Sequence, residues 1–164
     1  MVHPVPLDVH LIVTKGAEMT LGQETECCLE ELWTLADVVH DCKNIGAAPA
    51  SGSFKTMGMI VVPCSMKTLA GIVSGYSDNL LLRAADVTLK ERRKLVLVTR
   101  ECPLGTIHLR NMLEISQLGG VVIPPVLSYY GRPKSIEDCS RHIVGKLLEP
   151  IDLEGEELHR WEGM

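Results

Sequence analysis

The sequence predicts an α/β fold in a single domain, with a parallel sheet covered by helices. Short apolar runs alternate with helical patterns along the chain, which favours parallel strands joined by helical crossovers. Aromatic residues make up only 4% of the 164 residues, so the core must be aliphatic, as is typical of buried parallel strands. Small polar or charged residues directly follow two of the apolar runs, and open α/β sheets bind ligands at such strand ends.

The first part of the chain predicts two strands with a helix and a loop between them. Residues 8–14 (DVHLIVT) are rich in apolar and β-branched residues and predict a strand. Residues 16–36 show apolar positions at helical spacing and predict a helix. Residues 43–56 are small and polar and predict a loop. Residues 59–62 predict a buried strand that Pro63 ends.

The rest of the chain continues the same alternation. Residues 66–74 predict a short helix, and Ser77, Asp78 and Asn79 offer caps for a helix that runs to about Arg92. The remaining elements, in order, are a buried strand at 95–99, a helix at 107–118 closed by Gly119 and Gly120, a third core strand at 121–123 stopped by Pro124 and Pro125, a loop with Tyr129 and Tyr130, a helix from 135 to about 149, and a tail at 150–164.

The composition argues against several classes of protein. The net charge is -5, and the main cationic run, KERRK at 90–94, is expected to be a solvated helix end, so nucleic-acid binding is not expected. The six cysteines show no zinc spacing and are expected to be free thiols in a reducing cytoplasm. No run approaches the roughly 18 apolar residues of a membrane span, and the N-terminus lacks the features of a signal peptide. We therefore expect a cytoplasmic protein without a membrane partner.

A candidate anion site follows the second predicted strand. Ser65, Met66, Lys67 and Thr68 come directly after this strand and open a predicted helix. Free backbone N–H groups at a helix start, together with the two hydroxyls, can hold a phosphate. Hydroxyls at helix starts are more often plain caps, so the pattern alone leaves both interpretations open.

Charged residues gather at two further places. Arg83, Asp86 and Lys90 are spaced to share one helix face, with the two cations roughly 10 Å apart. A surface row of ion pairs is the alternative there. Arg100 and Glu101 directly follow a buried strand, where an Arg can clamp a phosphate and a Glu can carry a proton. A salt bridge at the strand end is the alternative in that case.

Five other residues are weaker candidates. Tyr130 and Lys146 lie on a loop and on the following helix and could grip a second anion, although their spacing cannot show that they meet. Thr14 ends the first strand and could face the same crevice. Glu24 is expected to be an exposed helix acid, and His108 to be a structural hydrogen-bonding residue near a helix start.

Taken together, the motifs resemble those of the UbiX-type flavin prenyltransferases, which are sometimes named as one of the subunits of phenolic acid decarboxylases. The resemblance runs from about residue 8 to residue 161, and its block at 63–101 is too long for chance. The shared motifs are VTKGA at 13–17, ASGS at 50–53, PCSMKTLAGI at 63–72, RAADVTLKERRKLVLVTRE at 83–101, IHLRNML at 107–113 and YYGRP at 129–133. The related flavin-dependent cysteine decarboxylases share the fold but carry different motifs.

The resemblance implies a Rossmann-like, flavodoxin-like domain with a three-layer, doubly wound parallel sheet that binds FMN and needs no metal. Such proteins join a dimethylallyl group from dimethylallyl phosphate to N5 and C6 of the flavin. UbiD-type decarboxylases then use the prenylated FMN. The family forms large homo-oligomers, commonly dodecamers.

The resemblance also implies roles for the candidate residues. Glu101 would be the acid/base at the departing phosphate, and Glu24 a second polar group near the flavin. Contacts with FMN are implied for Thr14, Ser65, Met66, Lys67, Thr68 and Arg100. Contacts with dimethylallyl phosphate are implied for Arg83, Lys90, Tyr130 and Lys146, with Trp161 closing the site.

The chain departs from the family pattern at two places. Lys146 stands where the family often has Arg, which keeps the charge but loses the planar fork. The family's N-terminal strand and its G-x-[ST]-G-A loop, part of a strand–loop–helix unit, are absent from residues 1–164. We therefore expect a vacant interior position in the sheet and exposed strand edges.

Two alternatives to the transferase follow from the same residues. The first is an FMN-binding accessory subunit of a hydroxyarylic acid decarboxylase, without transferase activity of its own. The second is direct decarboxylation by a relative of the flavin-dependent cysteine decarboxylases, against which the different motifs of that group argue.

Overall fold

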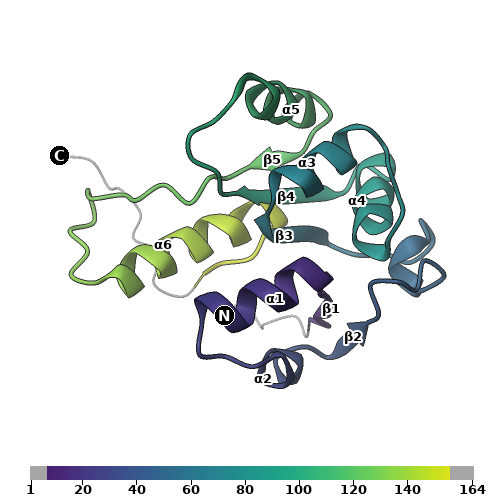
Figure 1. The fold of residues 1–164 in the computed structure, drawn as a ribbon, viewed down its shortest axis with the longest axis horizontal. Coiled ribbons are helices and arrows are strands. Elements are labelled where there is room, and N and C mark those ends of the chain that lie inside the picture. Colours follow the sequence, from purple (N-terminus) through teal and green to yellow (C-terminus); the bar gives the residue numbers. More distant parts are fainter. Residues whose placement is uncertain (1–6, 156–164) are drawn as a thin grey trace.

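A parallel sheet of three strands forms the centre of the structure, a computed structural model that describes residues 7–155 (Figure 1). Strand β4 (Lys94–Thr99) lies between β3 (Gly58–Cys64) and β5 (Val121–Val122), and the strands run parallel. Residues 95–99 of β4 are all buried. Continuous burial of this kind requires helices on both faces of the sheet.

Helices cover the two faces and make three layers (Figure 1). On one side lie α3 (Met66–Val73), α4 (Leu80–Lys90) and α5 (Thr106–Gln117), and on the other lies α6 (Ile136–Leu148). Leu95 and Leu97 of β4 pack into the core cluster of the first side. Val96 and Val98 pack with Leu147 of α6 on the second. Alternate residues of one strand thus bind the two helical layers together.

Local capping sets the starts of three of these helices. The side chains of Ser65, Asn79 and Ser135 accept hydrogen bonds from backbone N–H groups in the first turns of α3, α4 and α6, at 3.2, 3.0 and 3.1 Å. Each bond satisfies one of the donors that a helix start leaves free. After the end of α5, Gly119 has a φ of +95°, which glycine adopts without steric cost.

A second, smaller parallel sheet pairs β1 (His10–Ile12) with β2 (Val38–His40). Helices α1 (Lys15–Glu24) and α2 (Leu29–Thr34) connect its two strands along the chain. No side chain of residues 7–60 is fully buried, although Ile12 and Cys42 pack against the main core cluster. The N–H of Leu80 also donates to the carbonyl of Cys42 at 2.8 Å, which ties this part to α4.

The two sheets remain separate within the described residues. β1 pairs only with β2, and β3 only with β4. Each of β1 and β3 therefore has one strand edge without a partner strand among the described residues.

Most predicted elements are confirmed, with shifts of a few residues at their ends. The single helix predicted at 16–36 is wrong, because α1 and α2 are separated by residues 25–28. Thr25 closes α1 by donating from its backbone and its hydroxyl to the carbonyl of Leu21. Cys28 then starts α2, where its N–H donates to Glu31 at 2.9 Å. Two capping arrangements therefore interrupt a helical pattern that looked continuous.

Two further predictions about strands and loops need correction. Pro63 does not end the strand, since β3 continues to Cys64 through a register shift between Val61 and Cys64 that accommodates a residue without an N–H. Strand β2 was not predicted at all. The short 3₁₀ turns η1 (Ala48–Ala50) and η2 (Glu149–Ile151) add regular structure to the predicted loop and to the start of the tail.

Candidate functional site

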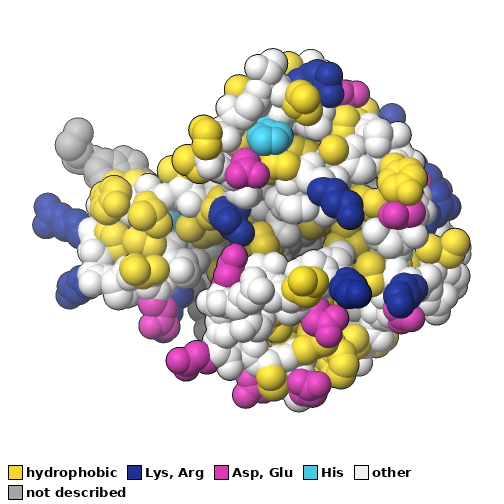
Figure 2. Space-filling model, viewed as in Figure 1, with side chains coloured by type: hydrophobic (Ala, Val, Ile, Leu, Met, Phe, Trp, Pro, Cys, Tyr) yellow, Lys and Arg dark blue, Asp and Glu magenta, His cyan; other side chains and the backbone are white. Residues whose placement is uncertain are grey.

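A cavity of about 1470 Å³ lies between the small sheet with its helices and the helical layer above the large sheet. Val13 and Thr14 line it from the end of β1, and Ser65 lines it from the end of β3. The carboxyl ends of parallel strands from both sheets thus face one space, as is usual for ligand sites in α/β folds. Figure 2 shows Lys and Arg side chains on both sides of a hollow in this face of the molecule.

Two helix starts meet at this cavity. Thr14 is the N-cap of α1, and its hydroxyl accepts from the N–H of Ala17 at 3.1 Å. Ser65 is the N-cap of α3, and its hydroxyl accepts from the N–H of Thr68 at 3.2 Å and donates to the Thr68 hydroxyl at 3.1 Å. The capping interpretation of Ser65 is therefore confirmed. The remaining free N–H groups and the helix dipoles still favour an anion at this place.

Four cationic side chains line the cavity, of which the sequence singled out only Lys67. Lys15 follows the Thr14 cap, Lys43 follows β2, and Arg110 lies on α5. Lys15 could have been identified from the sequence as a candidate, because it directly follows a Thr that can cap a helix. Lys43 and Arg110 lie far from Thr14 and Ser65 in the sequence, and the fold brings them to the same cavity.

Apolar side chains complete the walls. Trp33 of α2, Leu81 and Leu82 of α4 and Ile107 of α5 all line the cavity. The combination of apolar walls with a cationic edge is suited to a flat aromatic ligand that carries a phosphate.

His40 lies at the cavity and pairs with His10 across the small sheet. Nδ1 of His10 is 2.8 Å from Nε2 of His40, the rings stack with their centroids 5.1 Å apart, and Phe54 meets His10 edge-on. Burial lowers the pKa of His40, and the nearby His10 lowers it further. One of the two rings must accept this bond through an unprotonated nitrogen.

Arg100 and Glu24 are brought together. Nη2 of Arg100 lies 3.6 Å from Oε1 of Glu24, which joins the end of β4 to the last residue of α1. Glu101 is exposed, and its carboxylate accepts from the N–H of Cys102 at 3.0 Å. These three residues do not line the cavity described above.

Arg83 and Lys90 lie on α4 and do not line the cavity either. Arg83 pairs with Asp86 at 2.8 Å, as its spacing indicated, and also donates from Nε to the carbonyl of Ala50 at 3.3 Å. Lys90 pairs with Glu91 at 2.6 Å, so it does not extend the row through Asp86.

The other predicted site residues are scattered. The hydroxyl of Tyr130 lies 3.1 Å from Nε2 of His142, and Lys146 pairs with Glu149 at 2.8 Å, so these bonds do not join Tyr130 to Lys146. The side chain of Met66 packs against the core cluster and does not line the cavity. Trp161 lies outside the described residues.

The structure gives three further results for residues 7–155. It places no three His, Cys, Asp or Glu side chains where together they could hold a metal ion. None of the helices in this range has the length and apolar character needed to cross a membrane. His108 accepts from the N–H of Gly105 at 3.2 Å, which confirms its structural role.

Comparison with known proteins points to one family. A family model described as Flavoprotein matches residues 5–148. A probable UbiX-like flavin prenyltransferase from Sedimentibacter hydroxybenzoicus is 54% identical over 156 residues, which cover 95% of this chain and 82% of the relative.

Solved structures agree with this result. The crystal structure of AnUbiX (PadA1) in complex with FMN and dimethylallyl pyrophosphate matches with a TM-score of 0.92 and 51% identity, over 94% of this chain and 82% of that one. A dodecameric FMN-dependent UbiX-like decarboxylase from Escherichia coli O157:H7 matches with a TM-score of 0.91 and 48% identity, over 96% of this chain and 84% of that one. The flavodoxin-like α/β fold predicted from the sequence is confirmed.

Proposed function

The chain belongs to the family of UbiX-like flavin prenyltransferases, and from this premise we propose that it joins a dimethylallyl group from dimethylallyl phosphate to reduced FMN. The observation that carries the proposal is the cavity at which the capped starts of α1 and α3 meet among Lys15, Lys43, Lys67 and Arg110. Two helix starts with surrounding cations suit the FMN phosphate.

The residues around the cavity suit both the phosphate end and the ring system of FMN. Thr14 and the Ser65–Thr68 turn would hold the phosphate end, with Lys67 adding charge. Trp33, Leu82 and Ile107 offer apolar surface for the ring system. Reduced FMN supplies N5 and C6, the two positions at which the new bonds form.

The cationic and acidic residues outside the cavity suit the departing phosphate. When the allylic C–O bond breaks, its electron pair leaves with the phosphate, whose negative charge grows. By resemblance to the family, Arg83, Lys90, Tyr130 and Lys146 would contact the phosphate and stabilise that charge, and Trp161 would close the site. Glu101 would carry a proton at the leaving group, and Glu24 with Arg100 would position the flavin side.

We propose a homododecamer as the working form. The Escherichia coli relative is dodecameric, and this chain exposes large apolar side chains, with Val126 at 70%, Tyr129 at 72% and Ile136 at 85% exposure. Such surfaces are typical of subunit contacts. Light scattering after size exclusion tests the assembly, and a monomer at micromolar concentration would contradict it.

We also propose that the slot between β1 and β3 accepts a further parallel strand that residues 7–155 do not supply. Both neighbouring strands have an unpaired edge within the described residues, and the cavity exceeds the roughly 300–1,000 Å³ of usual ligand pockets. Fusing the strand–loop–helix unit of a relative ahead of residue 1 should raise both Tm and FMN affinity. No change in either would contradict the proposal.

The product, prenylated FMN, would pass to a UbiD-type decarboxylase, and the enzyme would work in the cytoplasm. The cysteines of residues 7–155 are all free thiols, which suits a reducing compartment. Transfer can be followed by the activation of a purified apo-decarboxylase, and fractionation of the source cells tests the location. A decarboxylase left inactive by the product would contradict the partner.

The decisive experiment mixes the chain with FMN, dimethylallyl phosphate and a reductant without oxygen, and looks for prenylated flavin by mass spectrometry. Flavin binding without product would instead support the accessory-subunit alternative, which the comparisons do not favour because the relative from Sedimentibacter hydroxybenzoicus is named as a prenyltransferase. Direct cysteine decarboxylation has no supporting motif in the chain.

A further inference from the structure

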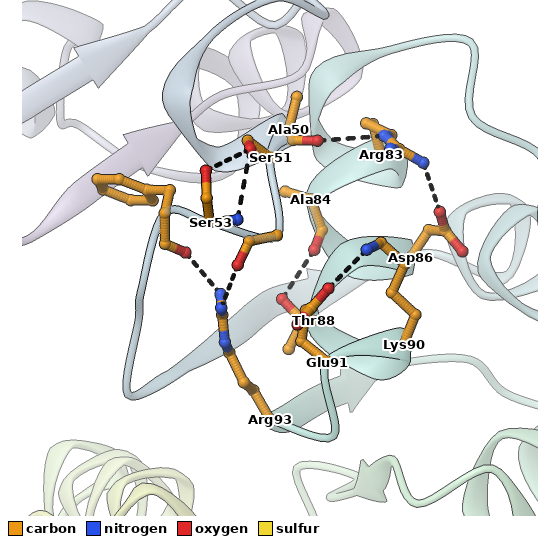
Figure 3. Close-up of polar contacts among 12 residues, drawn as sticks. Ala50, Ser51, Ser53, Arg83, Ala84, Asp86, Thr88, Lys90, Glu91 and Arg93 are labelled. Atoms are coloured by element: carbon orange, nitrogen blue, oxygen red, sulfur yellow. Dashed lines mark hydrogen bonds and ion pairs between the residues drawn. The ribbon is translucent and has the colours of Figure 1, made fainter.

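Residues 50–54 form a turn that two arginines of α4 and its following loop hold in place (Figure 3). Arg93 donates from Nη1 to the carbonyl of Phe54 at 2.6 Å and from Nη2 to the carbonyl of Gly52 at 2.7 Å. Arg83 donates to the carbonyl of Ala50. Every second carbonyl of the turn is therefore fixed by a guanidinium, which is a strong, charge-assisted arrangement.

Gly52 lies directly against the ion pair of Lys90 and Glu91. A Cβ at Gly52 would overlap the carboxylate of Glu91 and would lie 3.0 Å from Nζ of Lys90. The absence of a side chain at Gly52 lets the turn approach the two charged groups this closely. The hydroxyls of Ser51 and Ser53 lie 2.9 Å apart in the same turn.

Glu91 balances the charge of Lys90. Nζ of Lys90 lies 2.6 Å from Oε1 of Glu91, and both side chains remain partly open to solvent. The hydrogen bond from Lys90 lowers the pKa of Glu91, with smaller contributions from the charges of Lys90 and Arg93. Glu91 therefore competes with any anion that approaches Lys90.

We propose that Arg93 and Gly52 are positioning residues for Lys90 and Arg83, and that Glu91 is the counter-ion that the phosphate of dimethylallyl phosphate displaces. The inference rests on the proposed function. Arg93 acts through the turn, because its two bonds fix Gly52 against Lys90 and the same turn presents Ala50 to Arg83. The phosphate carries up to two negative charges and replaces one carboxylate at Lys90.

The proposal predicts that two substitutions raise KM for dimethylallyl phosphate and that a third lowers it. Arg93→Gln loses the two charge-assisted bonds and should raise KM for dimethylallyl phosphate about tenfold. Gly52→Ala should raise it in the same direction, because the new methyl group pushes the ends of Lys90 and Glu91 aside. Glu91→Gln should lower KM about two- to fivefold, because the anion that competes at Lys90 is removed.

The experiment measures KM for dimethylallyl phosphate, kcat, FMN affinity and Tm for the wild type and these variants. Lys94→Gln is the matched control, since it removes an exposed positive charge next to Arg93 without touching the turn. Arg93→Lys should recover part of the loss. FMN affinity should stay constant throughout.

The outcomes distinguish failure of the proposed function from failure of the inference about Arg93, Gly52 and Glu91. A wild type that makes no prenylated flavin overturns the proposed function. An active wild type with unchanged KM in Arg93→Gln and Gly52→Ala, or a KM in Glu91→Gln that rises, overturns this inference alone. Loss of Tm in Arg93→Gln with an unchanged KM would show a merely structural role and would also overturn it.

Discussion

The guanidinium of Arg100, which follows β4, lies 3.6 Å from the carboxylate of Glu24, the last residue of α1. Both side chains are about 60% exposed, so the pair adds no more than about 1 kcal/mol to stability. We expect Glu24→Gln to leave urea unfolding nearly unchanged but to lower kcat at least about tenfold, because the proposed site places the charge of Glu24 near the flavin. A variant with unaltered kcat would remove Glu24 from the site.

Glu101→Gln tests the proposed acid/base. The amide keeps the shape of the side chain and can still accept from the N–H of Cys102, but it cannot carry a proton. We expect turnover to fall at least about a hundredfold while FMN titration gives the wild-type affinity. Glu137→Gln, at an exposed position of α6, serves as the control. Loss of flavin binding in Glu101→Gln would mark the residue as structural.

Ser65→Ala tests the role of the α3 start. The variant loses a cap bond at 3.2 Å and should cost about 1 kcal/mol of unfolding free energy. Ser135→Ala removes an equivalent cap from α6, away from the cavity. We expect similar stability losses, with weaker FMN binding only in Ser65→Ala. Equal flavin affinities in the two variants would contradict the placing of the FMN phosphate.

The His10–His40 pair makes stability depend on pH. The pKa of His40 is lowered in the folded protein, so between that pKa and the ordinary 6.5 the unfolded chain binds a proton that the folded chain does not. The unfolding free energy should therefore fall as the pH drops from 7.5 to 5. In His40→Gln that fall should be smaller, and in His142→Gln it should match the wild type. Urea unfolding midpoints measured at the two pH values test this prediction. Equal falls in the unfolding free energy of all three proteins would show that His40 is not the source of the pH dependence.

Cys64 should resist alkylation. It is fully buried, and burial raises the pKa of its thiol to about 12. Cys28 and Cys102 are exposed and should react first with iodoacetamide at pH 8. Peptide mass mapping over time gives the order. Early labelling of Cys64 in the native protein would show that β3 opens readily.

The sequence predicted the large sheet well because its strands are continuous apolar runs that helices bury. It missed β2 because residues 38–40 form only three partly or fully exposed positions, too few to show a period. It merged α1 with α2 because the break at Thr25 depends on cap bonds, which a pattern of apolar positions does not record.

The site was predicted only where strand ends and helix starts coincide. Thr14, Ser65, Lys67 and Thr68 do line the cavity, because each follows a strand closely. Lys43 and Arg110 could not be found, since their contribution depends on how β2 and α5 sit around the same space. The proposed role of Arg93 could not be predicted for a similar reason, because its hydrogen-bond partners lie about 40 residues earlier in the chain.

The lack of any fully buried side chain between residue 7 and Val61 makes the molecule uneven in its resistance to opening. Backbone amides of β1 and β2 should exchange with solvent deuterium through small, frequent fluctuations, while those of β4 should wait for global unfolding. A ligand that touches both Thr14 and Ser65 would bind only when the two parts are closed together. Such a ligand would therefore hold the two parts in contact, and its affinity would be reduced by the free energy of that closure.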